Sequence, residues 1–425
     1  MKSFTKINRR NFLRTGATGA AAAALFSAPG VLTSCTKQEE DRYSRLDEII
    51  ATPVFKRELF NEPVIIESVE LLRYRNSFLC RVRSNQGAEG WSVGNDFQMV
   101  HLYPIFVNRL QSFFIGKDAR DWEDLLRDVY VYRSNYKLQN LALWVPLATI
   151  EFAVFDMLGK IAGKSLGELI GDIHHTDIAV YQANNYRGLS AEESAERIRD
   201  QVIETGAKAV KFKVGGRMTD PEIPEGRSDE LIPLIRKVLG PDMIIYADAN
   251  GSYDVEESVR IGRLMEEQQF DFFEEPVPFD WFEETKMVAD ALKIPIAGGE
   301  QEASMHAFRW LIGHNALQVT QPDIFYFGGI VRSMKVALMS AAKGIECTPH
   351  ISGSGLGFLY MMHFVSVLPN AGAYHEFKGF NVHLPFECPT SDLKIVDGKI
   401  KVPTGPGLGI IIDPDHIKNY SVVNT

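Results

Sequence analysis

Apolar positions along this chain change their spacing twice, and each change predicts a different kind of element. Between residues 64 and 93 apolar and polar residues alternate, as in Leu79-Cys80-Arg81-Val82, around turns that contain Asn, Gln and Gly. This alternation is typical of strands that bury one face. From 98 to 171 the apolar residues recur at helical spacing, most clearly from Ala148 to Lys160. The first part of the chain is therefore expected to be a sheet followed by helices.

From residue 178 onward, short apolar runs alternate with segments of helical periodicity such as Ala191–Thr205, Asp229–Leu239 and Val255–Gln268. The expected strands are Ile178–Asn184, Ala209–Val214, Met243–Asp248, Phe270–Glu275, Ile294–Ala297, Leu317–Gln321, Ile345–Pro349 and Ala373–Phe377. Eight strands that alternate with helices imply a parallel sheet, and this number can close into a barrel. The Pro- and Gly-rich stretch 384–409 is expected to return and pack on the first domain.

Charged residues mark the ends of these runs at regular intervals. They are Lys211 and Lys213, Asp248, Glu274, Glu300, Asp323, His350 and Glu376. After Asp248 the steps are 26, 26, 23, 27 and 26 residues, which is about the length of one βα unit. Because the carboxyl ends of barrel strands converge on one mouth, we expect these side chains to form a ring there.

Three carboxylates, those of Asp248, Glu274 and Glu300, end three consecutive predicted strands. Three hard oxygen ligands around one point suit Mg²⁺, which leaves its other positions to water or substrate. The alternative for each acid alone is a helix cap or a solvated loop residue. Their common register favours a magnesium site.

Lys211 and Lys213 are two residues apart, so strand alternation points both side chains to the same face, with Phe212 on the other. If Phe212 faces the helices, both ammonium groups face the barrel interior. The alternative, a solvated edge strand, does not fit a closed barrel. Repulsion between two neighbouring lysines is expected to lower their pKa values, which would help one of them to act as a base.

His350 and Asp323 end neighbouring strands and are expected to form a pair. A carboxylate beside an imidazole fixes its tautomer and stabilises its protonated form. Glu376 ends the eighth strand and could hydrogen-bond a substrate oxygen. A divalent ion that binds a substrate carboxylate, a base that removes the neighbouring α-proton and cations that stabilise the resulting enediolate together indicate enolisation chemistry.

These motifs jointly resemble the enolase superfamily, mandelate racemase subgroup, which includes proteins similar to mandelate racemase and muconate lactonizing enzyme. The resemblance covers about residues 60–415. It is carried by Lys211-Phe212-Lys213, Asp248-Ala249-Asn250, Glu274-Glu275-Pro276, Gly299-Glu300, Pro322-Asp323 with Gly328-Gly329, Pro349-His350 and His375-Glu376. The segment from Phe155 to Lys164 also looks like the family's domain junction.

The resemblance implies an α/β fold in which an N-terminal α+β capping domain, completed by the C-terminal segment, covers a modified TIM (β/α) barrel with Mg²⁺ at its mouth. The expected boundaries are 1–34 for an export signal, 35–60 for a tether and lead-in, 61–172 for the capping domain, 173–380 for the barrel and 381–425 for the C-terminal return. The implied metal ligands are Asp248, Glu274 and Glu300, with Glu274 rather than Glu275 at the second position.

The resemblance also implies roles for the other charged residues. Lys213 would be the base on one face of the substrate, and the Asp323–His350 dyad would be the acid/base on the other. Lys211 would touch the substrate carboxylate. Glu376 would help to stabilise the enolate.

The subgroup contains racemases and acid-sugar dehydratases, and both can use Lys213 and His350. Dehydration of an acid sugar to a 2-keto-3-deoxy acid is the leading interpretation, and a racemase, epimerase or cycloisomerase of a hydroxy acid is the alternative. Asn250 stands where some dehydratases of the family, similar to galactonate dehydratases, carry His. A third hypothesis is an exported lipoprotein that binds a carboxylate without turning it over. Candidate substrate-binding residues are Tyr181, Asn184 and Asn250.

Charge and the N-terminus limit the partners. The net charge is −10, with no basic cluster outside the extreme N-terminus, which argues against nucleic acid. The run from Asn8 to Arg14 contains paired arginines before Phe-Leu and an Ala-rich apolar stretch, which resembles a twin-arginine signal, and Leu32 to Cys35 resembles a lipobox. We therefore expect an exported protein, periplasmic or anchored through a lipid on Cys35, rather than one with an uncleaved transmembrane anchor. A homo-oligomer is also expected.

Overall fold

The structure, a computed structural model, describes residues 42–353, 355–379 and 384–424. The chain divides into two units, Met1–Arg45 and Leu46–Thr425, and every element below belongs to the second. The expected export signal, with Cys35, lies outside the described residues. The predicted domain boundaries stay predictions.

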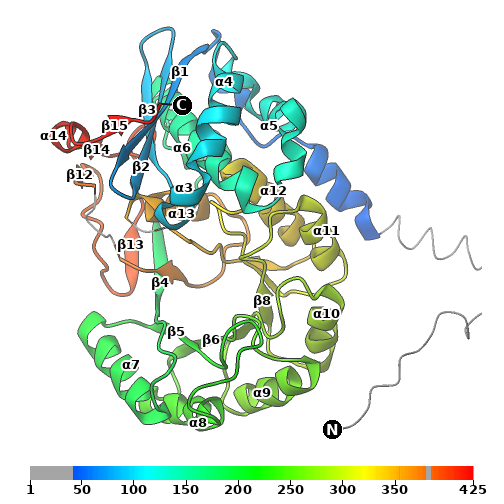
Figure 1. The fold of residues 1–425 in the computed structure, drawn as a ribbon. Coiled ribbons are helices and arrows are strands. Elements are labelled where there is room, and N and C mark those ends of the chain that lie inside the picture. Colours follow the sequence, from blue (N-terminus) through cyan, green and yellow to red (C-terminus); the bar gives the residue numbers. More distant parts are fainter. Residues whose placement is uncertain (1–41, 354, 380–383, 425) are drawn as a thin grey trace, which may run out of the picture. The chain divides into compact units, whose positions relative to one another are not determined.

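A four-stranded antiparallel sheet forms the first layer (Figure 1). Its strands are β1 (Ile66–Tyr74), β2 (Ser77–Ser84), β3 (Glu89–Val93) and β15 (Ser421–Val422), in the order β15-β1-β2-β3. The expected alternation buries one face of these strands. Because β15 pairs with Leu72 and Arg73 of β1, the C-terminal segment completes this sheet, as predicted.

Helices pack on this sheet and complete the capping domain. They are α3 (Asp96–Ile105), α4 (Gln111–Phe114), α5 (Trp122–Val131) and α6 (Leu141–Ala162). Helix α6 is long and apolar enough to span a membrane, but 89% of its most apolar window is buried. A helix that is apolar all round is the core helix of a larger protein. It ends at Gly163, which adopts the left-handed conformation that favours glycine.

Parallel strands follow one another around the second layer. They are β4 (Asp177–Ala183), β5 (Ala209–Lys213), β6 (Ile244–Asp248), β7 (Phe272–Glu274), β8 (Ile296–Gly298), β9 (Val319–Thr320), β10 (Glu346–Cys347) and β11 (His375–Phe377). The hydrogen-bonded order runs from β4 to β10, and β11 pairs with β4. A parallel bridge between Cys347 and Ala371 joins β10 to the chain entering β11, which closes the ring. The predicted α/β barrel is therefore confirmed.

Helices surround the strands on the outside (Figure 1). They are α7 (Ala191–Thr205), α8 (Arg227–Leu239), α9 (Val255–Glu267), α10 (Phe282–Ala291), α11 (Met305–Gly313), α12 (Ile330–Ala341) and α13 (Leu356–Ser366). The remaining elements are the helical turns η1 (Arg57–Leu59), η2 (Phe106–Leu110), η3 (Ala119–Asp121), η4 (Tyr132–Leu138) and η5 (Gly167–Leu169), the strands β12 (Phe386–Glu387), β13 (Lys399–Lys401) and β14 (Ile411–Ile412), and α14 (Pro414–Ile417).

Strand alternation separates two cores. Phe212 packs in the outer core between strands and helices, so Lys211 and Lys213 point inward, as expected. Inside the barrel a small apolar layer contains Tyr181, Tyr246 and Phe272. The charged strand ends lie beyond this layer, which gives the site an apolar floor.

Candidate active site

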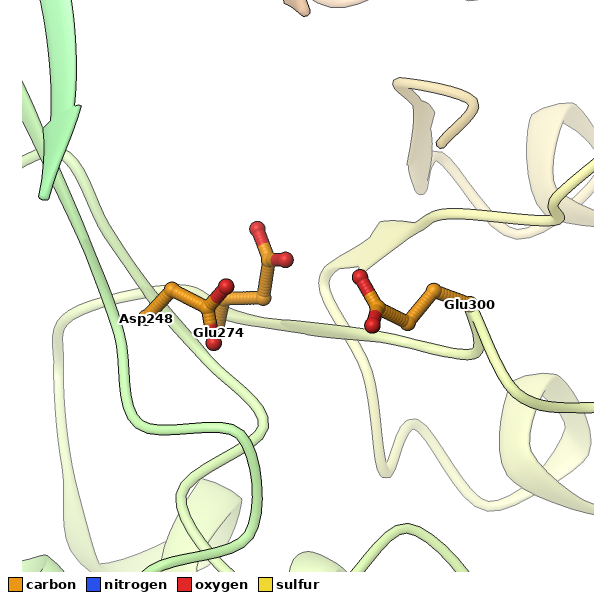
Figure 2. Close-up of side chains that lie close together, drawn as sticks. All are labelled: Asp248, Glu274 and Glu300. Carbon is orange, nitrogen blue, oxygen red and sulfur yellow. The ribbon is translucent and has the colours of Figure 1, made fainter. Parts of the chain in front are cut away.

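The three predicted ligands lie side by side because of the strand register. Asp248 ends β6 and is the ladder partner of Glu274, which ends β7. Glu300 follows β8 by two residues. Carboxylate oxygens of the three lie within 4.8 Å of one another, and all three side chains are buried. Figure 2 shows their carboxylates turned toward a common space.

This group of carboxylates fits a divalent cation. Mg²⁺ prefers oxygen ligands and takes about six of them, so three carboxylates leave positions for substrate or water. Burial, together with the negative charges of Asp248 and Glu300, raises the pKa of Glu274 to about 7 even though Lys211 opposes the shift. A cation between the three side chains would relieve this repulsion. Both the donor chemistry and the crowding of negative charge therefore match a magnesium site.

Lys211 occupies the inner side of the triad. Its Nζ lies 2.9 Å and 2.8 Å from the two carboxylate oxygens of Glu274 and 3.6 Å from Glu376 Oε1. Burial favours the neutral amine, but the charges of Glu274, Glu376 and Asp248 outweigh it and raise the pKa of Lys211 well above its ordinary value. The expectation that lysine–lysine repulsion lowers this pKa is therefore wrong for Lys211, because carboxylates from other strands dominate its surroundings.

Lys213 contacts the triad from the β5 side. Its Nζ hydrogen-bonds to Asp248 and donates to Asn250 Oδ1 at 3.1 Å. The ladder pairs Lys213 with Asp248 directly, so the contact follows from strand register. A base at this position would reach a substrate held at the triad from the β5–β6 side.

His350 contacts the triad from the other side. Its Nδ1 lies 2.7 Å from Asp323 Oδ2, and its Nε2 lies 3.3 Å from Glu300 Oε2 and 3.5 Å from Glu376 Oε2. Burial disfavours the charged imidazolium, but Glu300 and Glu376 outweigh it, so the pKa of His350 lies above its ordinary value. The pairing with Asp323 fixes the proton on Nδ1 and leaves Nε2 for chemistry.

Glu376, on β11, lies between the ammonium groups of Lys211 and Lys378. Its Oε2 is 3.0 Å from Lys378 Nζ. Burial would raise the pKa of Glu376, but Lys378 and Lys211 hold it below its usual range. The carboxylate is therefore charged, and it faces both Lys211 and His350.

The candidate substrate-binding residues lie in different surroundings. Tyr181 is 1% exposed, within the apolar floor, with Lys211 Nζ 5.2 Å from its ring centroid. Asn184 is buried and donates to the carbonyl of Lys211, so it joins β4 to β5. Asn250 accepts hydrogen bonds from Lys213 and from Arg187. Their contact with a substrate stays a prediction.

Several polar residues at the site were not predicted. Gln321 donates to Glu274 Oε2 at 2.8 Å, Arg187 donates to Asn250 Oδ1 at 2.9 Å, and Lys378 Nζ lies 3.4 Å from His350 Nε2. Lys378 is two residues after Glu376, so strand alternation could have placed both on one face. Arg187 lies in a loop, where the sequence gives no periodicity to use.

The capping domain reaches the His350 side through hydrogen bonds. Asn95, the N-cap of α3, donates to Ser352 Oγ at 2.8 Å. Ser352 in turn donates to Asp323 through its backbone N–H and its hydroxyl. Asp323 also accepts from the backbone of Phe325. A substitution of Asn95 in the capping domain would therefore alter hydrogen bonds that reach the Asp323–His350 dyad through Ser352.

Glu151, buried in α6, makes a second connection. Its carboxylate accepts from Trp122 Nε1 at 2.7 Å and from the Val331 N–H at 3.1 Å, at the N-terminus of α12. A Cβ on Gly329 would come within 2.0 Å of Glu151 Oε1, which explains the glycine there. Burial, which outweighs these hydrogen bonds, raises the pKa of Glu151 to about 7. An acceptor at a helix N-terminus joins the capping domain to the barrel.

Known proteins share this architecture. The family model for the enolase C-terminal domain-like fold matches residues 193–416. The chain is 28% identical over 314 residues to the arabinonate dehydratase of Saccharolobus solfataricus, covering 73% of this chain and 81% of that protein. It is 25% identical over 359 residues to the D-galactarolactone cycloisomerase of Agrobacterium fabrum, covering 81% and 91%.

Solved structures agree with the sequence matches. The mandelate racemase/muconate lactonizing protein from Paracoccus denitrificans, complexed with magnesium, superposes with a TM-score of 0.75 at 25% identity. The match covers 85% of this chain and 99% of that one. The family model, the relatives and the solved structure thus agree on the fold and on the general kind of chemistry.

Proposed function

The chain belongs to the enolase C-terminal domain-like family, and we propose that it removes the α-proton of a carboxylate substrate, most specifically to dehydrate an acid sugar to a 2-keto-3-deoxy acid. It is an enzyme of the dehydratase or isomerase kind, as its relatives are. The observation that carries the proposal is the pair of proton-transfer groups at the carboxylate triad: Lys213 contacts Asp248, and His350 contacts Glu300.

Asp248, Glu274 and Glu300 would hold the Mg²⁺ ion. When bound, Mg²⁺ would polarise the substrate carboxylate and stabilise the negative charge that develops when the α-proton leaves. Lys211 is charged and buried against Glu274. It would stabilise the negative charge on the oxygens of the substrate carboxylate from the inner side of the barrel.

The proton transfers fall to Lys213 and His350. Lys213 Nζ takes the α-proton, and the electron pair of the broken C–H bond forms the enediolate. The C–O bond at the β-carbon then breaks, and His350 Nε2 gives its proton to the leaving oxygen, which departs as water. The enol tautomerises to the 2-keto acid. Asp323 keeps the imidazole oriented during both steps.

A racemase, epimerase or cycloisomerase is the second candidate. His350 reaches the triad from a different side than Lys213, which supports proton delivery to the opposite face of the same intermediate. One relative is named a cycloisomerase. Binding of a carboxylate without turnover is the third candidate, although both proton-transfer groups are in place here.

The experiment is proton NMR in D₂O on the Mg²⁺-loaded protein with a panel of aldonic, aldaric and uronic-derived acids. We expect one or more α-proton signals to disappear, and chelation of Mg²⁺ with EDTA to stop the loss. A 2-keto-3-deoxy product identifies dehydration, and inverted starting material identifies the alternative. Bound Mg²⁺ with no exchange of any acid would contradict enolisation and favour the binding protein.

We also propose export, with anchoring through a lipid on Cys35. The support is the paired arginines at Arg9-Arg10 and the apolar stretch that ends at Cys35. Fractionation of cells that express the full chain or a Cys35→Ala variant tests this. Release of the variant from the membrane fraction is the expected result, and equal membrane association of both chains would contradict it. The expected homo-oligomer is checked by the mass in solution.

A further inference from the structure

Arg187 lies beside the candidate base and carries a charge that nothing in the described part of the chain pairs. It belongs to the loop between β4 and α7, and its Nη2 donates to Asn250 Oδ1 at 2.9 Å. The same oxygen accepts from Lys213 Nζ. Arg187 is therefore one shared acceptor away from the amine that would take the α-proton.

The guanidinium of Arg187 has an N–H donor that no described residue accepts. Its Nε is buried and has no hydrogen-bond partner, and among the residues that the structure describes no carboxylate lies within ion-pair distance of Arg187. Asp248 and Glu300 attract its charge from farther away, while Arg217 repels it. Those two carboxylates already contact Lys213 and His350. A half-buried, unpaired guanidinium with an unpartnered N–H is suited to binding an anion.

The loop that carries Arg187 is held firmly. Arg227, the first residue of α8 and 2% exposed, donates to the carbonyls of Tyr186 and Leu189 on either side of Arg187 at 2.7 Å and 3.0 Å. It also donates to the carbonyl of Lys213 at 2.9 Å. One buried side chain thus fixes the loop and the base strand together, so Arg187 is positioned before any ligand arrives.

We propose that Arg187 binds a second carboxylate of the substrate, which makes the preferred substrate a dicarboxylic acid sugar. This inference rests on the proposed function, since it assumes that the first carboxylate lies at the Asp248–Glu274–Glu300 triad. The planar fork of arginine matches a carboxylate in two parallel hydrogen bonds. A hydroxyl would leave the charge unpaired, so a neutral chain end is the poorer fit.

Matched pairs of acids that differ at one end test the proposal: galactonate with galactarate, gluconate with glucarate, and arabinonate with arabinarate. Binding of each to the Mg²⁺-loaded Lys213→Met protein is measured by calorimetry, so that no turnover interferes. We expect at least one diacid to bind about 10–100-fold more tightly than its monoacid. Arg187→Gln in the same protein is expected to remove that difference between the diacid and its monoacid.

The control is Arg199→Gln, which removes the same charge from a partly exposed position of α7 and should leave both affinities as they were. Equal binding of mono- and diacids, no binding of any diacid, or a preference that survives Arg187→Gln would each overturn the proposal. α-Proton exchange of monoacids by the unsubstituted protein separates these outcomes from failure of the proposed function, because enolisation needs Lys213 and His350 but not Arg187.

Discussion

Lys213 and His350, the two groups proposed to transfer protons, are held in different ways. Lys213 pairs with Asp248, itself a candidate metal ligand, and with Asn250. His350 is fixed through Nδ1 by Asp323, which is outside the carboxylate triad. The position of the lysine therefore depends on what the triad holds, whereas the imidazole is oriented by a carboxylate of its own.

The supports behind them differ as well. On the Lys213 side, the contacts described above come from the barrel: Arg227 holds the carbonyl of Lys213. On the His350 side, Asn95 of the capping domain contacts Ser352, which donates to Asp323. The difference teaches that one side of the site is set by the barrel, while the other is also coupled to the capping domain through Asn95.

Removing each group in turn would separate the two sides. In Lys213→Met and His350→Asn variants we expect turnover to fall about 10²–10⁴-fold, the usual contribution of a positioned acid or base. Each variant should retain α-proton exchange on the substrate face served by the other residue. Proton NMR in D₂O with two substrates that are epimers at C2 measures this exchange. Equal loss of exchange with both epimers in both variants would show that the two residues do not serve different faces of the substrate.

Changing the supports is expected to have smaller and unequal effects. Asp323→Asn loses the charge that fixes the imidazole, and we expect turnover to fall on the order of 10²-fold. Asn250→Ala removes one of two contacts of Lys213, so about tenfold is expected. Mg²⁺ affinity by calorimetry should stay unchanged in Asp323→Asn, and a large loss of metal there would show that the dyad is not independent of the triad.

The coupling to the capping domain predicts a pH dependence of stability. Because burial raises the pKa of Glu151 from 4.5 to about 7, the folded state binds more protons than the unfolded chain between these values. This contribution is fully present below about pH 4.5 and is lost as the pH rises through about 7, on the order of 3 kcal/mol at most.

Urea unfolding at pH 5 and pH 8 measures this loss. Glu151→Gln, which cannot ionise, should reduce the difference in stability between the two pH values by the share that Glu151 contributes. Glu204→Gln on the exposed face of α7 is the control and should behave like the unsubstituted protein. If Glu151→Gln unfolded with the same pH dependence as the control, Glu151 would not be the titrating group.

An effect as small as that of Asn250→Ala is expected at Lys378. Its ammonium contacts Glu376, His350 and the carbonyl of Ile351, so its donors are used within the protein. Lys378→Met should lower turnover about tenfold by loosening Glu376, without changing the preference between mono- and diacids. Lys237→Met, at an exposed position of α8, controls for the loss of a positive charge. A change in diacid preference would assign Lys378, rather than Arg187, to the distal end of the substrate.

The sequence predicted the parts of this site that depend on period and spacing. The strand ends at Asp248, Glu274 and Glu300 are found together because parallel register alone aligns them. The pKa shift of Lys211 was predicted with the wrong sign, because it depends on carboxylates that only the closed barrel brings near. Arg187 was missed because its position is set by a loop and by Arg227, which donates to the carbonyls of Tyr186 and Leu189, 41 and 38 positions earlier in the chain.

Arg227 binds three backbone carbonyls of the Arg187 loop and the base strand, and none of these contacts requires a particular side chain on the loop. Substitution of Arg187 can therefore change what the loop offers a ligand while Arg227 still holds the carbonyl of Lys213. In evolutionary terms, the side chain at position 187 can be exchanged while the contacts that hold the loop to β5 are retained.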